Sequence, residues 1–167
     1  EWMTNPPFDH MAKGNHRFIR GNHDNPSVCR NHKQWIPDGT IEDNVMFIGG
    51  AWSIDHALRV EGISWWEHEQ CSHNQLNDFV DLAIAKKPSV IISHDCPMGI
   101  VPAVFLNHSK QHIVTRTGQA LESIRQLAPP KLWVFGHWHE SRDVIIDGTQ
   151  FVCLAELEAV DFDLGSY

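Results

Sequence analysis

Short apolar runs of four or five residues recur along this chain, and polar residues follow each of them. Residues 16–20 read HRFIR, residues 89–92 read SVII and residues 131–135 read KLWVF, and residues 45–48 form a similar run. Runs this short, bounded by polar, glycine or proline residues, are typical of strands. Residues 26–43 read as a polar loop. Because helical periodicity appears between the later runs, the pattern predicts strands alternating with helices, which is the α/β class.

One helix is predicted over residues 72–87. Ser72 and Gln75 fit a capping box at its start, and Pro88 follows its end. Its apolar face comprises Leu76, Phe79, Val80, Ala83 and Ile84.

A second helix and a hairpin are predicted in the C-terminal half. Thr117 is a candidate cap for the helix, and the side chains expected to point inward are Leu121, Ile124 and Leu127. Residues 143–146 and 149–154 predict two strands joined by Asp147-Gly148, a strong hairpin signal.

Composition narrows the class of protein. The 167 residues suffice for a single domain spanning 1–167, and 42% of them are hydrophobic. A net charge of −8 argues against a protein whose main task is to coat nucleic acid or an anionic membrane. No apolar run approaches the ~20 residues that span a bilayer. The four scattered cysteines predict reduced thiols in a cytoplasmic protein, and a disulfide is the minority alternative.

Histidine accounts for 12 residues, so position rather than abundance must select the functional ones. Three of the apolar runs end in a polar cluster that contains histidine: Gly21-Asn22-His23-Asp24, Ser93-His94-Asp95-Cys96-Pro97 and Gly136-His137-Trp138-His139. In open α/β sheets, ligands bind just outside the carboxyl ends of the strands. We therefore expect the three clusters to converge on one crevice.

The chemistry of these clusters favours a metal site. His137 and His139 would point the same way on an extended segment, because side chains alternate there. Imidazole and amide oxygen suit divalent ions such as zinc, manganese, iron or cobalt. For any one cluster, a polar turn whose side chains satisfy the backbone is the simpler interpretation. Three clusters at equivalent strand ends favour the metal.

The motifs resemble those of the calcineurin-like metallophosphoesterases. Residues 21–24 are similar to the GNH(D/E) motif of that family, residues 136–139 to its GHxH motif, and His94 to the isolated histidine between them. The resemblance covers the chain from about residue 14 onward and implies an αββα two-sheet sandwich. The run GGAWSID, with Arg59 and Trp65-Trp66 after it, resembles a phage and bacterial branch.

The resemblance also implies a ligand set. Asn22, His94 and His137 would bind one divalent ion and His139 a second, with manganese, iron or zinc as candidates. His23 would protonate the leaving oxygen of a phosphate ester, and Asp24 would orient His23 and favour its cationic form. Two ions would together bind the phosphate oxygens and activate a water molecule.

The chain departs from the family before residue 21. Neither the DxH motif nor the GDxxD motif of the family precedes Gly21. We therefore expect an N-terminally truncated domain that lacks a strand–helix–strand unit, binds at most one ion weakly and is inactive as a two-metal enzyme. Asp9-His10 is expected at the surface, and His108 and His112 in a solvated loop.

Several interpretations of function stay open. The first is hydrolysis of a phosphate mono- or diester, the second a non-catalytic remnant that binds a metal or a partner, and the third a nuclease with the same site. Phosphoprotein, nucleotide, diester or nucleic acid are all possible substrates. Nucleic acid is expected only as a substrate and no membrane partner is expected, whereas the oligomeric state is undetermined.

Four further residues have two interpretations each. Trp65 and Trp66, followed by Glu67, His68 and Glu69, either wall the substrate cleft, or one tryptophan packs and the other caps a surface loop. Asp55 and Arg59 either contact a phosphate-bearing substrate or pair with each other. Trp138, between two proposed ligands, is expected to pack and hold them in place.

Overall fold

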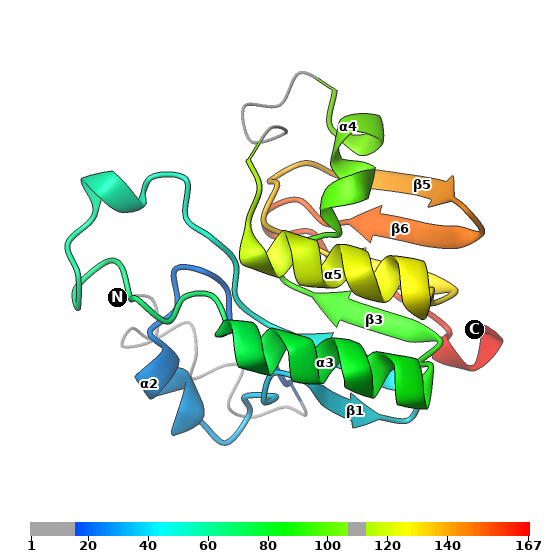
Figure 1. Ribbon diagram of the computed structural model, residues 1–167, viewed down its shortest axis with the longest axis horizontal. Helices are drawn as coiled ribbons and strands as arrows, with labels where there is room; N and C mark the ends of the chain where they lie inside the picture. Colours follow the sequence, from blue (N-terminus) through cyan, green and yellow to red (C-terminus); the bar gives the residue numbers. More distant parts are fainter. Residues whose placement is uncertain (1–15, 107–112) are drawn as a thin grey trace.

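The computed structural model describes residues 16–106 and 113–167, and its strands form one mixed sheet (Figure 1). The six strands lie in the order β1-β2-β3-β4-β6-β5. Their bounds are β1 Thr40–Glu42, β2 Val45–Ile48, β3 Val90–Ser93, β4 Leu132–Phe135, β5 Arg142–Ile146 and β6 Thr149–Cys153. The predicted α/β class is confirmed.

The centre of the sheet is parallel. Strands β2, β3, β4 and β6 run in the same direction, while β1 and β5 pair antiparallel at the two edges. Ile48 is in register with Ser93, and Ser93 with Phe135. The carboxyl ends of β3 and β4 therefore lie side by side, and the polar clusters that follow them begin at the same edge of the sheet.

Helices α3 (His73–Lys86) and α5 (Arg116–Leu127) pack on one face of this sheet (Figure 1). The predicted capping box of α3 is confirmed, because Ser72 accepts from the backbone of Gln75 while the Gln75 side chain accepts from the backbone of Ser72. Helix α5 begins earlier than predicted, with Thr115 rather than Thr117 as its cap. Leu127, expected to point inward, is 61% exposed because it belongs to the last turn.

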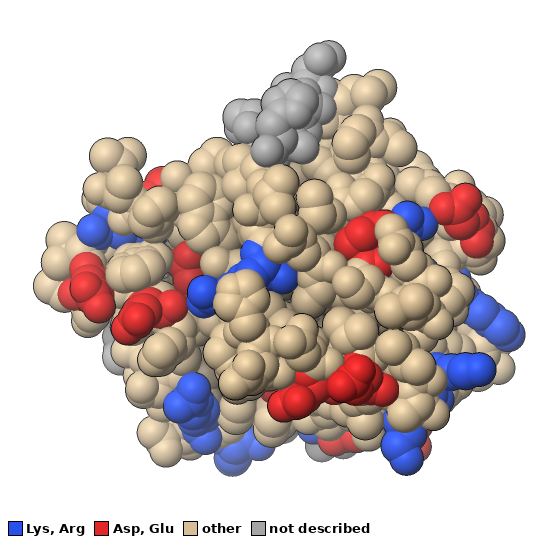
Figure 2. Space-filling view, in the orientation of Figure 1, with Lys and Arg blue, Asp and Glu red and all other residues tan. Residues whose placement is uncertain are grey.

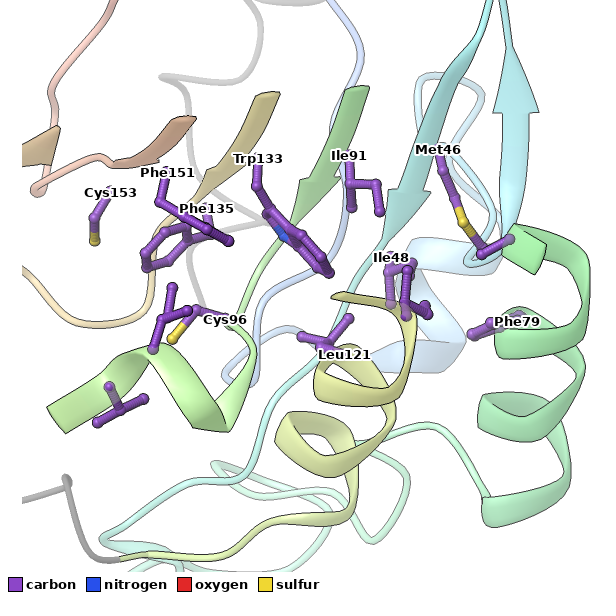
Figure 3. Packing of buried hydrophobic residues seen from close by; sticks show 14 of the residues in the cluster. Met46, Ile48, Phe79, Ile91, Cys96, Leu121, Trp133, Phe135, Phe151 and Cys153 are labelled. Carbon is purple, nitrogen blue, oxygen red and sulfur yellow. The ribbon is translucent and has the colours of Figure 1, made fainter. Parts of the chain in front are cut away.

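The main core lies between the sheet and these helices. Figure 3 shows Ile91 and Trp133 of the central strands facing Leu121 of α5, while Met46 and Ile48 face Phe79 of α3. Alternate strand residues such as Val45, Val90 and Leu132 form a second cluster on the opposite face. Phe162 and Tyr167 of the C-terminal segment pack against that second cluster. The central strands are thus apolar on both faces, as expected of parallel strands.

Two sequence predictions about the N-terminal half are wrong. Residues 16–20 form no strand of the sheet; Phe18 makes an isolated bridge with Trp35. The predicted loop 26–43 contains helix α2 (Pro26–Arg30), capped by Asn25, and strand β1. The expected two-sheet sandwich is not seen either, since the strands within 16–106 and 113–167 belong to one sheet.

A buried ion pair holds the segment that precedes the first polar cluster. Arg20 is 4% exposed and donates from Nε to Asp38 at 2.7 Å. Its other nitrogens donate to the carbonyl oxygens of His68 and Glu69 and to the sulfur of Cys71. The guanidinium therefore ties residues 20–24 to two other loops without a strand ladder.

The remaining elements are short. They are the 3-10 turns η2 (His56–Leu58), η3 (Met98–Ile100) and η4 (Leu164–Ser166), and helix α4 (Val101–Val104). All four cysteines are free and buried, as predicted. Among the helices of residues 16–106 and 113–167, none is both long and apolar enough to cross a membrane. The predicted surface position of Asp9-His10 and the predicted loop around His108 and His112 lie outside the described residues.

Candidate metal and catalytic site

Asn22 lies at the centre of the candidate site. It is 6% exposed, and its Oδ1 lies 3.0 Å from Nε2 of His94. Its Nδ2 donates to the hydroxyl of Ser53 at 2.9 Å and lies 3.3 Å from Nε2 of His23. The amide oxygen therefore faces the ring of His94, while the amide nitrogen faces the buried Ser53 hydroxyl and the ring of His23.

His94 and His137 follow the neighbouring strands β3 and β4. Their ring centroids are 5.1 Å apart, and the backbone nitrogen of Gly136 donates to the carbonyl oxygen of His94. Gly21 packs directly beneath His94, since a Cβ on this glycine would lie 3.0 Å from the imidazole Cε1. The absence of a side chain at Gly21 thus allows the first polar cluster to approach the second.

The segment from Gly136 to His139 is not extended, contrary to the sequence prediction. His137 has φ +68° and His139 has φ +58°, both in the left-handed region. The backbone turns sharply there because Trp138 donates to the carbonyl oxygen of Gly136 at 2.8 Å. His139 lies at the rim, with its Nδ1 3.2 Å from Oε1 of Glu156.

The structure brings the four proposed ligands to one cavity. A cavity of about 360 Å³ is lined by Asn22, His23, His94, His137 and His139, together with apolar residues of β3 and β4 and with Glu156. A second hollow of about 330 Å³ shares Asn22, His23, His137 and His139 and adds Asp55 and Arg59. Within the part of the chain that the structure describes, no group of three or more His, Cys, Asp or Glu residues has the geometry of a metal site.

The donor atoms that do converge suit a divalent ion. An amide oxygen and imidazole nitrogens are accepted by zinc, manganese, iron and cobalt. Two ligand atoms bound at ~2.1 Å and at a right angle lie about 3.0 Å apart. The separation of Asn22 Oδ1 and His94 Nε2 is 3.0 Å, so this pair fits adjacent positions around one ion.

His23 faces a guanidinium rather than the expected carboxylate. Its Nε2 lies 3.3 Å from Nη2 of Arg59. Burial and then the charge of Arg59 hold the pKa of His23 below its usual value, although Asp55, Glu69 and Asp24 act in the opposite direction.

Asp24 has a contact that the sequence did not predict. Its Oδ2 accepts a hydrogen bond from the backbone nitrogen of Gly21 at 2.6 Å. The side chain turns back on its own loop because that backbone donor is three residues away, within reach of a short carboxylate. Asp24 thus shapes the loop that carries Asn22 and His23. Its charge also acts to raise the pKa of His23, and the expectation that it orients His23 stays a prediction.

Asp55 and Arg59 pair with each other, as one of the two interpretations predicts, and contact with a phosphate-bearing substrate stays a prediction. Arg59 donates from Nε to Asp55 at 2.8 Å and from Nη1 to the carbonyl oxygen of Ser64. The guanidinium is thus fixed beside His23 at the edge of the hollow. Trp65 and Trp66 are half-buried in the same loop.

Trp138 packs as predicted. It stacks on Phe105 with ring centroids 4.3 Å apart, and its Nε1 donates to Asp95 at 3.1 Å. The indole therefore anchors the turn that carries both His137 and His139.

Two residues for which the sequence predicts no contact with the proposed ligands lie directly behind Asn22. Ser53 and Glu69 are 1% and 2% exposed, and the Ser53 hydroxyl donates to Glu69 at 2.6 Å. A buried carboxylate is unusual unless it is paired or hydrogen-bonded. Ser53 lies in the GGAWSID run and Glu69 follows Trp65-Trp66, but neither position indicates a contact with Asn22, since only the fold brings positions 22, 53 and 69 together.

In comparisons with known proteins, no protein-family model and no curated protein matched the chain.

Proposed function

We propose that this chain forms the metal-binding part of a divalent-metal-dependent phosphoesterase with a calcineurin-like fold, which hydrolyses a phosphate mono- or diester. The observation that carries the proposal is the approach of Asn22 Oδ1 to His94 Nε2, at 3.0 Å, in a cavity that His23, His137 and His139 also line. The motif resemblance of residues 21–24, His94 and residues 136–139 supports the same interpretation.

The proposed ligands divide into two sets. Asn22, His94 and His137 would hold one ion, and His139 would contribute to a second at the rim. Bound divalent ions supply Lewis-acid stabilisation of phosphate oxygens and activation of a water molecule. The chain's own residues hold the donor atoms in place: the amide of Asn22 through Ser53, and the turn carrying His137 through Trp138.

His23 is the proposed proton-transfer residue. Its Nε2 is close to both Asn22 and Arg59 at the wall of the cavity, within reach of a phosphate ester bound there. The lowered pKa favours the neutral ring in the free protein. A phosphate ester adds negative charge beside the ring, and such a charge favours the protonated form, which can donate to the leaving oxygen.

Charge supports an ester substrate rather than a nucleic-acid coat. On the face that carries α3 and α5, acidic and basic side chains are interspersed (Figure 2). A net charge of −8 adds to this preference. A cytoplasmic location is part of the proposal, and four free, buried thiols are consistent with it.

Metal binding to the 167-residue chain is the first test. We expect Co²⁺ to bind, with visible absorption bands, and we expect His94→Ala and His137→Ala to abolish binding because each removes a nitrogen ligand. His73→Ala is the matched control, since it removes an exposed imidazole at the start of α3. Equal binding by the wild-type chain and His137→Ala would overturn the proposal.

Turnover separates metal ligands from the proton-transfer residue. With Mn²⁺ and p-nitrophenyl phosphate or its bis-ester as substrate, a chain that holds only the ion bound by Asn22, His94 and His137 should hydrolyse the ester slowly. His137→Ala should abolish this hydrolysis. His23→Ala should keep its metal and lower the turnover of an ester with a basic alkoxide leaving group about 10²–10⁴-fold, the usual weight of a general acid. The loss should shrink for the nitrophenyl esters, because nitrophenolate leaves without a proton. Loss of metal in His23→Ala would instead make His23 a ligand.

A further inference from the structure

A buried carboxylate lies two hydrogen bonds behind the proposed metal ligand. Glu69 is 2% exposed, and both of its oxygens accept from one residue, Ser53: Oε1 from the backbone nitrogen at 2.8 Å and Oε2 from the hydroxyl at 2.6 Å. The Ser53 hydroxyl in turn lies 2.9 Å from Nδ2 of Asn22. Three buried side chains thus form a continuous line from Glu69 to the cavity.

The direction of the hydrogen bonds in this line is fixed by Glu69. The Ser53 hydroxyl donates to Oε2 of Glu69 at 2.6 Å, and a hydroxyl has a single hydrogen to donate. The hydroxyl oxygen can then only accept from its other neighbour. Asn22 must therefore turn its NH₂ group toward Ser53, which leaves its oxygen facing His94.

We infer that Ser53 and Glu69 are positioning residues that fix the orientation of the Asn22 amide, so that the oxygen and not the NH₂ group is presented to the metal. This inference rests on the proposed function. The contact between Asn22 Nδ2 and His23 Nε2, at 3.3 Å, agrees with the same orientation.

The orientation matters because the two ends of an amide are opposite in character. The oxygen has lone pairs that bind a cation, whereas the NH₂ group carries only donors and has the wrong polarity. A flipped Asn22 would present NH₂ to the cavity and to Nε2 of His94. Such a flip hardly changes the shape of the side chain, so only the hydrogen-bond network selects the orientation.

Glu69→Gln should reverse the direction of the hydrogen bonds from position 69 through Ser53 to Asn22, while the shape of the side chain at position 69 stays the same. One end of the introduced amide must still accept from the Ser53 backbone nitrogen, so its NH₂ group faces the Ser53 hydroxyl. That hydroxyl then accepts from position 69 and donates to Asn22. The favoured partner is the Asn22 oxygen, and the Asn22 amide flips.

The experiment compares Co²⁺ affinity across matched variants of the full chain. Glu69→Gln should weaken binding about 10–100-fold, as is typical when a partner of a metal ligand is changed. Glu67→Gln is the control, because it makes the same charge change two residues away at an exposed position. Equal losses in the two variants would show a charge effect and overturn the inference.

In the Asn22→Asp variant, Glu69→Gln is expected to strengthen Co²⁺ binding instead of weakening it. In Asn22→Asp both ends of the side chain are oxygens, so orientation loses its meaning, and a Ser53 hydroxyl directed at Glu69 leaves the introduced carboxylate without its donor. Adding Glu69→Gln frees that hydroxyl to donate to the carboxylate at position 22. The double variant should therefore bind Co²⁺ more tightly than Asn22→Asp alone. Weaker binding by the double variant would overturn the inference.

A metal-free readout separates this inference from the proposed function. In wild-type NMR spectra, the Asn22 NH₂ protons should show nuclear Overhauser contacts to Ser53, and in Glu69→Gln to His94 instead. If the wild-type chain binds no Co²⁺ but these contacts switch, the proposed function fails and the orientation mechanism stands. If Co²⁺ binds and the contacts are the same in both chains, the inference alone fails.

Discussion

His137 and His139 both have backbone conformations that side chains other than glycine rarely adopt. Left-handed residues of this kind cost of order 1–3 kcal/mol each when the surroundings impose them, and they concentrate at functional sites. The buried, stacked indole of Trp138 lies between the two histidines and holds the turn. We interpret this backbone strain as the cost of directing two imidazoles into one cavity from a single turn.

The strain at His139 gives a prediction about stability. The side chain is 61% exposed, so its removal loses few contacts. His139→Gly should therefore have a free energy of unfolding higher than His139→Ala by about 1 kcal/mol, because glycine tolerates a positive φ. Urea denaturation measures both variants.

A position within a helix provides the control, because there the alanine variant should be more stable than the glycine variant. Asn77 is exposed within α3, where φ is negative. Asn77→Gly should be less stable than Asn77→Ala by about 1 kcal/mol. If His139→Gly were less stable than His139→Ala, as expected for the two variants of Asn77, the left-handed turn would not be strained in solution.

The site residues that follow the strands were predictable from the sequence, but the buried residues that hydrogen-bond to the site were not. His94 and His137 follow short apolar runs, so their approach to each other follows from the parallel order of β3 and β4. Ser53 and Glu69 belong to a loop without periodicity, and serine and glutamate are ordinary surface residues. Only burial and hydrogen-bond direction reveal their place behind Asn22.

At the scale of elements, the strongest periodic segments were predicted and the weakest were not. The capping box fixes the start of α3, and β2 matches its apolar run residue for residue. Residues 16–20 were also predicted as a strand but form only the isolated Phe18–Trp35 bridge and a few further backbone hydrogen bonds, such as that from Gly50 to the carbonyl oxygen of Arg20. A strand depends on a partner far away in the chain, which local pattern does not specify.

The ion pair of Arg20 substitutes for the missing strand ladder, and a variant can test this. Asp38→Asn removes the carboxylate but leaves the Arg20 guanidinium 4% exposed. We expect it to lower the free energy of unfolding by about 3–5 kcal/mol, the usual effect of breaking a buried pair. Chemical denaturation followed by tryptophan fluorescence gives the value.

The exposed pair between Arg17 and Glu42 is the matched control for Asp38→Asn. It joins the same segment to β1, but both side chains are more than 40% exposed. Glu42→Gln should leave stability nearly unchanged, since solvent screens such pairs. Similar losses in Glu42→Gln and Asp38→Asn would mean that burial of Arg20 does not set its importance.

At the scale of the whole molecule, the sequence predicted the class of fold but not the number of sheets. Alternating strands and helices fix the parallel centre of the sheet and the helices on one face. The second face was expected to carry another sheet. Within the described residues it is packed instead by side chains such as Phe162 and Tyr167, and Tyr167 donates to Gln150 at 3.0 Å. Those aromatic residues have no periodicity that predicts this position.

The four buried thiols, spread over the whole structure, predict how stability varies with pH. Burial raises the pKa of Cys29, Cys71 and Cys153 to about 12, and that of Cys96 also lies well above its usual value. An unfolded thiol titrates near ~8.5. Between these values the unfolded chain holds fewer protons than the folded chain, so the free energy of unfolding must fall as pH rises through this window.

Urea denaturation at a series of pH values measures this slope, and a cysteine variant isolates its origin. Cys153→Ala removes one of the titrating thiols, so its stability should fall less steeply above about pH 8.5 than that of the wild-type chain, even if it is less stable at neutral pH. Below that pH the two curves should run parallel, because the thiols are protonated in both states.

The same burial should keep the native thiols unreactive toward Ellman's reagent at mildly alkaline pH, with full reaction only in urea. A stability that rose with pH in this window, or rapid reaction of the native thiols, would show that the cysteines titrate as if exposed and that the residues around them are more loosely packed than the structure indicates.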